Sequence, residues 1–176
     1  MTLVDVEIRH PDRFGELYDR HFEEIHRYLA ARLGGEAADD LAAETFLVAF
    51  RKRSSFDAGR GTARAWLYGI ATKLVAQHRR SEARRLRAFQ RAPRDGPDTG
   101  HEERVIDRVA AGAQGRLAAE LAGLAKGDRD VLLLVAVAEL SYEEVAEALG
   151  IPYGTVGSRL NRVRRKLRAA LGGMDG

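Results

Sequence analysis

The sequence predicts an all-α protein built from two small helical domains joined by a flexible linker. Apolar residues recur at helical spacing along most of the chain, and no segment has a strand-like pattern. Between the two helical parts, the chain is rich in Pro, Gly and charged residues and loses its apolar periodicity. A length of 176 residues suits one ordinary domain or two small ones, so the linker decides the question. We expect domains at residues 1–90 and 114–176, with the linker at 91–113.

The first domain is predicted to hold three helices. The first carries its apolar residues from Phe14 to Leu33 and ends at Gly34 and Gly35. The second, over residues 36–53, is acidic in its first turns and basic at its end, which complements the helix dipole. Residues 54–61 form a loop, and Thr62 then caps a long helix that extends to about Arg87.

The second domain contains a pattern typical of a helix-turn-helix. Ser141 and Glu144 form a capping box for a short helix that ends at Gly150. A turn is expected over residues 151–154, followed by a helix whose buried stripe includes Val156 and Leu160. That second helix directs polar and basic residues outward, as a recognition helix does in the major groove. The alternative is a helical hairpin with a solvated basic face. The outward residues are Ser158, Arg159, Asn161, Arg162, Arg165 and Lys166.

Charge is distributed in blocks. Residues 79–94 hold seven arginines against one acid, and residues 151–176 hold six basic residues against one acid. Residues 95–150 between them hold 12 acidic and 5 basic residues. Two basic blocks in an otherwise acidic chain predict two separate contacts with a polyanion. For either block alone, a solvated helix face is the alternative.

Two features of the first domain indicate partners. Residues 38–50 are acidic and then strongly apolar, with more hydrophobic surface than one buried stripe requires, so a protein partner or a fully buried central helix would explain them. Aromatic residues lie close to basic ones in the following segment, which suits single-stranded nucleic acid, although Trp66 fits the buried stripe better. This group contains Phe56, Trp66, Tyr68, Lys73, Gln77, Arg79 and Arg80.

Composition argues against several classes of protein. There is no cysteine, and therefore no disulfide or cysteine-ligated metal. The five histidines are scattered, so we expect no metal, no cofactor and no catalytic site, and the protein is not expected to be an enzyme. No apolar run reaches the roughly 18–20 residues of a membrane span, and residues 1–10 are too charged for a secretory signal. We expect a cytoplasmic protein without membrane contact.

Two motifs resemble those of the extracytoplasmic-function (ECF) group of bacterial RNA polymerase sigma factors, over residues 14–171. Asp39-Asp40-Leu41-Ala42-Ala43-Glu44-Thr45-Phe46, with Phe56 and Ala65-Trp66-Leu67-Tyr68-Gly69-Ile70-Ala71, resembles region two of that family. Leu140-Ser141-Tyr142-Glu143-Glu144-Val145-Ala146, with Gly154-Thr155-Val156-Gly157-Ser158-Arg159-Leu160, resembles region four. The resemblance implies a factor that directs core polymerase to promoters. Region two would correspond to residues 1–90 and region four to residues 114–176.

The resemblance also implies where partners bind. Region two would bind the clamp helices of the largest polymerase subunit through Asp39, Asp40, Leu41, Glu44, Phe46 and Leu47. It would contact the melted minus-ten element through Phe56, Lys73, Gln77, Arg79 and Arg80. Region four would bind the polymerase flap and read the minus-thirty-five element through Thr155, Ser158, Arg159, Asn161, Arg162, Arg165 and Lys166. An anti-sigma factor is a further implied partner, and the free chain is expected to be a monomer.

Four positions depart from the family pattern. Ala43 stands where glutamine is usual, Lys73 where asparagine is common, and Gly157 and Val135 at positions that can carry a cation. Fewer cations predict weaker minus-thirty-five binding, by about one phosphate contact each. The alternative function is a stand-alone helix-turn-helix regulator that binds DNA without polymerase. That alternative leaves the first basic block unexplained.

Overall fold

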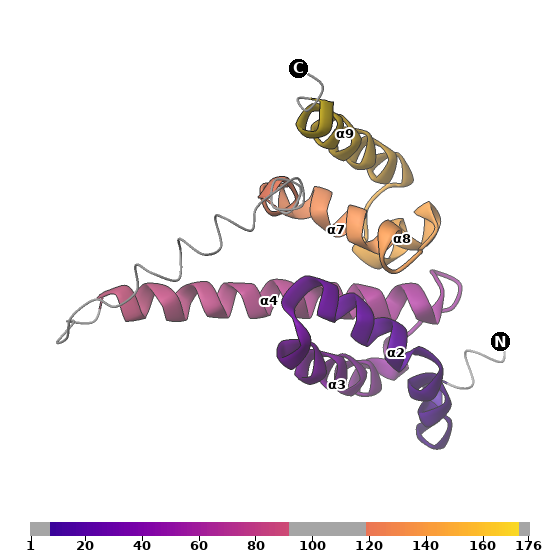
Figure 1. The fold of residues 1–176 in the computed structure, drawn as a ribbon. Coiled ribbons are helices and arrows are strands. Elements are labelled where there is room, and N and C mark those ends of the chain that lie inside the picture. Colours follow the sequence, from indigo (N-terminus) through magenta and orange to yellow (C-terminus); the bar gives the residue numbers. More distant parts are fainter. Residues whose placement is uncertain (1–7, 92–118, 173–176) are drawn as a thin grey trace.

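The structure is a computed structural model that describes residues 8–91 and 119–172, and within those ranges it is all-α (Figure 1). The predicted linker, residues 91–113, lies almost wholly outside the described residues, so the predicted domain boundaries stay a prediction. We call residues 8–91 the N-terminal lobe and residues 119–172 the C-terminal lobe. None of the described helices combines the length and apolar character that a membrane crossing demands.

The N-terminal lobe is a bundle of three helices, α2 (Phe14–Leu33), α3 (Gly35–Lys52) and α4 (Ala63–Arg91). Each helix packs against the other two. Only Gly34 separates α2 from α3, at a φ of 88° that favours glycine. One-turn 3-10 segments, Pro11–Arg13 and Arg53–Ser55, precede α2 and follow α3. The helices predicted from the sequence are therefore confirmed, with α3 beginning one residue early and α4 ending four residues late.

Aromatic residues fill much of this bundle. Tyr28 and Tyr68 are fully buried and meet edge to face with their ring centroids 5.2 Å apart, an arrangement that aromatic pairs prefer. The Tyr28 hydroxyl and Thr72 Oγ1 are hydrogen-bonded at 2.8 Å, so the buried phenol has a partner. The predicted N-cap of α4 is also confirmed, because Thr62 Oγ1 accepts a hydrogen bond from the Ala65 N–H at 3.1 Å.

The C-terminal lobe contains α7 (Lys126–Ala136), α8 (Tyr142–Leu149) and α9 (Tyr153–Gly172). The predicted capping box of α8 is present in full, with Ser141 and Glu144 bonded reciprocally. Gly150 ends α8 in the left-handed conformation, at a φ of 63°. The predicted turn over residues 151–154 is too long, since α9 begins at Tyr153. The reason is Pro152, which is preorganised for a helix start and whose carbonyl accepts the Thr155 N–H at 2.9 Å.

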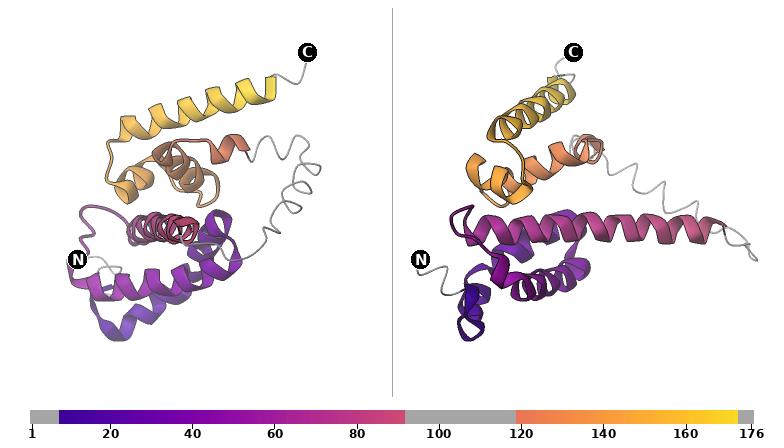
Figure 2. Two further views of the ribbon diagram at one scale, coloured as in Figure 1. Left: turned by 90° about the vertical axis from the view of Figure 1, so that its left-hand side faces the viewer. Right: turned by 180° about the vertical axis from the view of Figure 1, so that it is seen from behind.

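The two lobes pack against each other, chiefly through α8 and α4 (Figure 2). A single cluster of buried residues extends from α2, α3 and α4 into α7, α8 and α9. The C-terminal part of α4 extends beyond this body (Figure 1), and residues 82–91 are all exposed. Helix α8 contacts both α4 and α9.

Candidate nucleic-acid and polymerase interfaces

The predicted polymerase face divides into exposed and buried residues. The acidic side chains Asp39, Asp40 and Glu44 are exposed along α3. Leu41 and Phe46 point into the bundle and are only 6% and 4% exposed. Leu47, in contrast, is 47% exposed. A rigid partner could therefore touch the acidic residues and Leu47, whereas Leu41 and Phe46 support that surface from beneath.

An aromatic cluster beneath this face includes a residue that the sequence reasoning did not select. Tyr18 stacks on Phe22 with ring centroids 4.8 Å apart and meets Phe46 edge to face at 4.9 Å. Tyr18 is 39% exposed, so its ring, together with Leu47, supplies exposed apolar surface beside the acids. The position of Tyr18 on the apolar stripe of α2 predicted only core packing. The packing of α2 against α3 shows instead that the ring is partly exposed.

The predicted minus-ten residues on α4 have different environments. Lys73, Gln77 and Arg80 are exposed. Arg79 is half-buried and donates a hydrogen bond to the Arg32 carbonyl at 3.0 Å. Burial, together with the neighbouring charges of Arg32 and Arg129, lowers the pKa of Arg79. Arg79 thus ties α4 to the end of α2, while the other three remain open to solvent.

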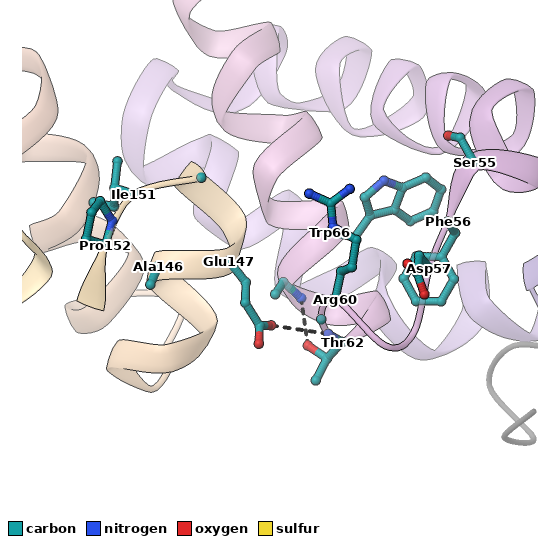
Figure 3. Close-up of a pocket in the computed structure, with 13 residues that line it drawn as sticks. Ser55, Phe56, Asp57, Arg60, Thr62, Trp66, Ala146, Glu147, Ile151 and Pro152 are labelled. Carbon is teal, nitrogen blue, oxygen red and sulfur yellow. Dashed lines mark hydrogen bonds between the residues drawn. The ribbon is translucent and has the colours of Figure 1, made fainter.

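The loop before α4 borders a cavity of about 670 Å³ at the seam between the lobes (Figure 3). Phe56 and Trp66 lie on one side of it, with ring centroids 5.2 Å apart, and Phe56 is only 3% exposed. Glu147 reaches in from α8 and accepts a hydrogen bond from the Thr62 N–H at 3.3 Å. In this arrangement, Phe56 packs within the fold and offers little ring surface to a nucleic-acid base.

The recognition helix, α9, also divides into free and engaged residues. Ser158, Asn161, Arg165 and Lys166 are exposed, and Thr155 is partly exposed. Arg162 pairs with the buried carboxylate of Asp128, with N–O distances of 2.9 and 3.2 Å. The pair joins α9 to the first turn of α7. Sequence reasoning missed Asp128, for which its place in a helix-initial turn was the only signal.

Arg159 turns toward the seam between the lobes. Its guanidinium donates to the Gly127 carbonyl at 3.4 Å. It also lines a second cavity, of about 410 Å³, whose other lining cations are Lys126 from its own lobe and Lys73 and Arg80 from α4. The structure thus brings residues of the predicted minus-ten set and one residue of the predicted minus-thirty-five set around one cavity.

Two arginines of the N-terminal lobe bind the C-terminal lobe, and neither was selected from the sequence. Arg32 forms an ion pair with Asp130 at 2.5 Å, with both side chains buried. Arg64 lies 2.9 Å from Glu24 of its own lobe, donates to the Ala138 carbonyl at 2.6 Å and lies 3.6 Å from Glu144. No sequence periodicity couples residues so distant along the chain.

The comparisons with known proteins match both lobes. Residues 17–85 match the family model of sigma-70 region 2, and residues 114–167 match that of sigma-70 region 4. The chain is 35% identical over 151 residues to the ECF RNA polymerase sigma factor SigC of Mycobacterium tuberculosis, covering 84% of this chain and 77% of that one. It is 32% identical over 169 residues to the RNA polymerase sigma factor YlaC of Bacillus subtilis, covering 92% and 93% of the two chains.

Other relatives agree with this result. The chain is 35% identical to the ECF sigma factor SigE of Mycolicibacterium smegmatis but spans only 59% of its length. Among solved structures, CnrH in complex with the cytosolic domain of CnrY has a TM-score of 0.65 and 26% identity, covering 98% of this chain and 97% of that one. The class of protein is therefore the sigma-70 type of promoter-specificity factor. Within this class, the chain belongs to the ECF group of RNA polymerase sigma factors.

Proposed function

We propose that this sigma factor uses the exposed acidic and apolar residues of α2 and α3 to dock on core polymerase. Asp39, Asp40 and Glu44 would meet basic groups on the clamp helices of the largest subunit, and Tyr18 and Leu47 would supply the apolar contact. Exposure supports this assignment, because these side chains reach solvent without unfolding the bundle. Asp39 also pairs with His26 Nε2 at 2.6 Å, and a basic group of the polymerase would share or replace that contact.

DNA contacts are assigned to two separate lobes. Lys73, Gln77 and Arg80 on α4 would hold the melted minus-ten strand, where cations follow the backbone. The outward face of α9 would enter the major groove at the minus-thirty-five element, with Asn161 at base edges and Arg165 and Lys166 at phosphates. The observation that carries this assignment is the exposed polar face of α9, where Arg165 and Lys166 form no ion pair within the described residues.

Three consequences follow for partners and location. Core polymerase and promoter DNA are the two main partners, and we place the chain in the bacterial cytoplasm, where both are found. The polymerase flap would bind the C-terminal lobe. An inhibitory protein partner, an anti-sigma factor, also fits the proposal, since the similar CnrH is in complex with the cytosolic domain of CnrY.

The first experiment is binding of the purified chain to core polymerase, followed by run-off transcription from genomic fragments. We expect co-migration with core and discrete start sites. Binding to duplex DNA without any binding to core would instead support the stand-alone regulator.

A matched pair of variants separates the two interfaces. Asn161→Ala should lose about 1–3 kcal/mol of minus-thirty-five discrimination while core binding is retained. Leu47→Ala should weaken core binding while promoter preference is retained. Asn161 and Leu47 are better probes than Arg162 and Phe46 because both are exposed. Arg162 is engaged in an ion pair with Asp128, and Phe46 is buried, so changes at those two positions would also disturb the fold. Equal loss of both activities in either variant would contradict the assigned roles.

A further inference from the structure

The recognition helix α9 begins with a large aromatic side chain that the sequence reasoning did not assign to any contact. Tyr153 is the first residue of α9 and is 55% exposed. Among the described residues of the C-terminal lobe, it is the one large hydrophobic side chain that is exposed. Val156 and Leu160 of the same helix point inward and belong to the core. Core packing therefore does not account for Tyr153.

The ring of Tyr153 is nevertheless held in place. Its centroid lies 6.1 Å from that of Tyr142, the first residue of α8, and the two rings are inclined at 48°. Tyr142 is itself fixed from two sides. It packs half-buried against the core, and its hydroxyl accepts a hydrogen bond from Arg164 Nη2 at 3.3 Å. A ring that is already positioned loses little conformational entropy when it meets a partner.

The surface of α9 beside Tyr153 is low. A Cβ atom at Gly154 or Gly157 would meet nothing within 4 Å, so both positions open on solvent. Tyr153, Gly157 and Asn161 follow one another at intervals of four residues, which places them along one side of α9 over about 12 Å. The glycines let another molecule approach the helix backbone closely. The Tyr153 ring therefore projects beside a strip that a DNA groove can approach, next to a residue assigned to base edges.

The chemistry of an aromatic ring selects its ligand in the major groove. Base edges present hydrogen-bonding groups there and one apolar group, the C5 methyl of thymine. The Tyr153 ring suits the methyl group, whereas Ser158 and Asn161 suit the polar edges. In a helix-turn-helix, the first residues of the recognition helix are the ones that reach base edges.

We propose that Tyr153 is a specificity-determining residue that packs its ring on the C5 methyl group of a thymine in the minus-thirty-five element. Tyr142 and Arg164 are positioning residues that hold the ring at the edge of the groove. The inference rests on the proposed function, because it requires α9 in the major groove. It adds an apolar contact to the polar contacts already assigned.

Deoxyuridine substitution tests the contact one methyl group at a time. The full chain is bound to core polymerase, and the promoter is one recovered by run-off transcription. Each thymine of its minus-thirty-five element, on either strand, is replaced in turn by deoxyuridine, which lacks only the C5 methyl. Fluorescence anisotropy measures the affinity of the holoenzyme for each duplex. We expect one replacement to weaken wild-type binding by about fourfold, the factor expected for one buried methyl group.

Two variants of Tyr153 identify the protein side of the contact. Tyr153→Ala should bind the unmodified promoter about fourfold more weakly and should lose its sensitivity to deoxyuridine at that one position. Tyr153→Phe keeps the ring and should behave as the wild type. The matched control is Lys166→Ala, at an exposed position of the same helix assigned to phosphate. It should weaken binding to every duplex alike and keep the deoxyuridine penalty.

The positioning role has its own readout. Tyr142→Phe removes only the hydroxyl that Arg164 holds, so the deoxyuridine penalty should shrink at the same thymine and at no other. An unchanged penalty in Tyr142→Phe would show that this hydrogen bond does not position the Tyr153 ring.

The outcomes separate this inference from the proposed function. Equal deoxyuridine penalties in the wild type and Tyr153→Ala, or no sensitive thymine in the wild type, would overturn the inference alone. A Tyr153→Phe variant as weak as Tyr153→Ala would assign the contact to the hydroxyl and would also overturn it. Loss of core binding in Tyr153→Ala with promoter preference retained would mean that the ring faces polymerase instead. A wild-type chain that binds core without any promoter preference would contradict the proposed function, and this inference with it.

Discussion

The two lobes differ in the side chains that fill their cores. The N-terminal lobe is a closed bundle in which α2, α3 and α4 all touch, with large aromatic side chains such as Tyr28 and Tyr68 fully buried. Within its described residues, the C-terminal lobe buries aliphatic side chains such as Val131 and Leu134 and two carboxylates, Asp128 and Asp130, but no aromatic ring. Its helix α8 packs on α4 as well as on its own neighbours. The N-terminal lobe thus fills its core with aromatic rings from its own helices, whereas the C-terminal lobe also relies on contact with α4.

This contrast has a physical basis. A small helical unit buries too little apolar surface to be strongly stable alone. Contact with α4 removes further surface of α8 from water, which stabilises the packing of the two lobes. The small core of the C-terminal lobe is therefore completed by its contact with the N-terminal lobe.

The largest expected effect is on the N-terminal lobe. Phe46→Ala removes a ring that is 4% exposed and packs against Tyr18 and Phe22, and should lower the free energy of unfolding by about 3–5 kcal/mol. Urea denaturation measures this change. Leu47→Ala, at an exposed neighbouring position, is the control and should change stability by less than about 1 kcal/mol. Similar losses of unfolding free energy in both variants would mean that the buried Phe46 ring does not support the acidic face of α3.

The next effect is on the seam. Asp130→Asn leaves the buried guanidinium of Arg32 without a counter-charge, which typically costs about 3–5 kcal/mol when the charge stays buried. Here the lobes can separate and return Arg32 to water, so we expect opening rather than unfolding. Small-angle scattering should show expansion, while the helical circular dichroism signal stays constant. A compact Asp130→Asn protein would show that the Arg32–Asp130 pair is dispensable for the packing of the two lobes.

A smaller effect is expected within the C-terminal lobe. Ser141→Ala removes the hydroxyl that accepts the Glu144 N–H at 3.1 Å and should cost about 1 kcal/mol of stability. The loss should appear as earlier local opening of α8 in hydrogen exchange, since this lobe has the smaller core. Ser55→Ala, which alters an exposed hydroxyl at the end of a 3-10 turn, provides the comparison. Equal exchange in the two variants would argue against the capping box as a determinant of α8.

The smallest effect depends on pH. Burial by itself would raise the pKa of the Glu24 carboxyl, but hydrogen bonds from His21 and Arg64 outweigh it and lower that pKa below its ordinary value of 4.5. A lowered pKa in the folded state means that this carboxylate stabilises the fold above about pH 4.5 and loses its contribution as the pH falls through the lowered pKa. Glu24→Gln should therefore flatten the stability profile in acid. Thermal denaturation between pH 3 and 7 checks this, and an unchanged profile would show that Glu24 contributes nothing to it.

Local patterns predicted the helices well, because caps, glycines and apolar periodicity act within a few residues of each other. The Thr62 cap, the Ser141–Glu144 capping box and the break at Gly34 are all confirmed. The recognition helix was misplaced by two residues because the helix-starting effect of Pro152 was underestimated. The roles of the predicted site residues stay predictions, although the structure separates exposed ones such as Asn161 from buried ones such as Phe56.

The sequence by itself determined the all-α fold class, the two motif-bearing halves and the residues that carry the family likeness, because each depends on short-range spacing. The tertiary structure alone decided which of those residues are free. Arg162 is engaged by Asp128, Phe46 lies under Tyr18, and Arg32 meets Asp130 from the other lobe. These contacts join residues from 28 to 98 positions apart. Burial and ion pairing at such separations arise only when helices are placed against one another, and no local pattern encodes them.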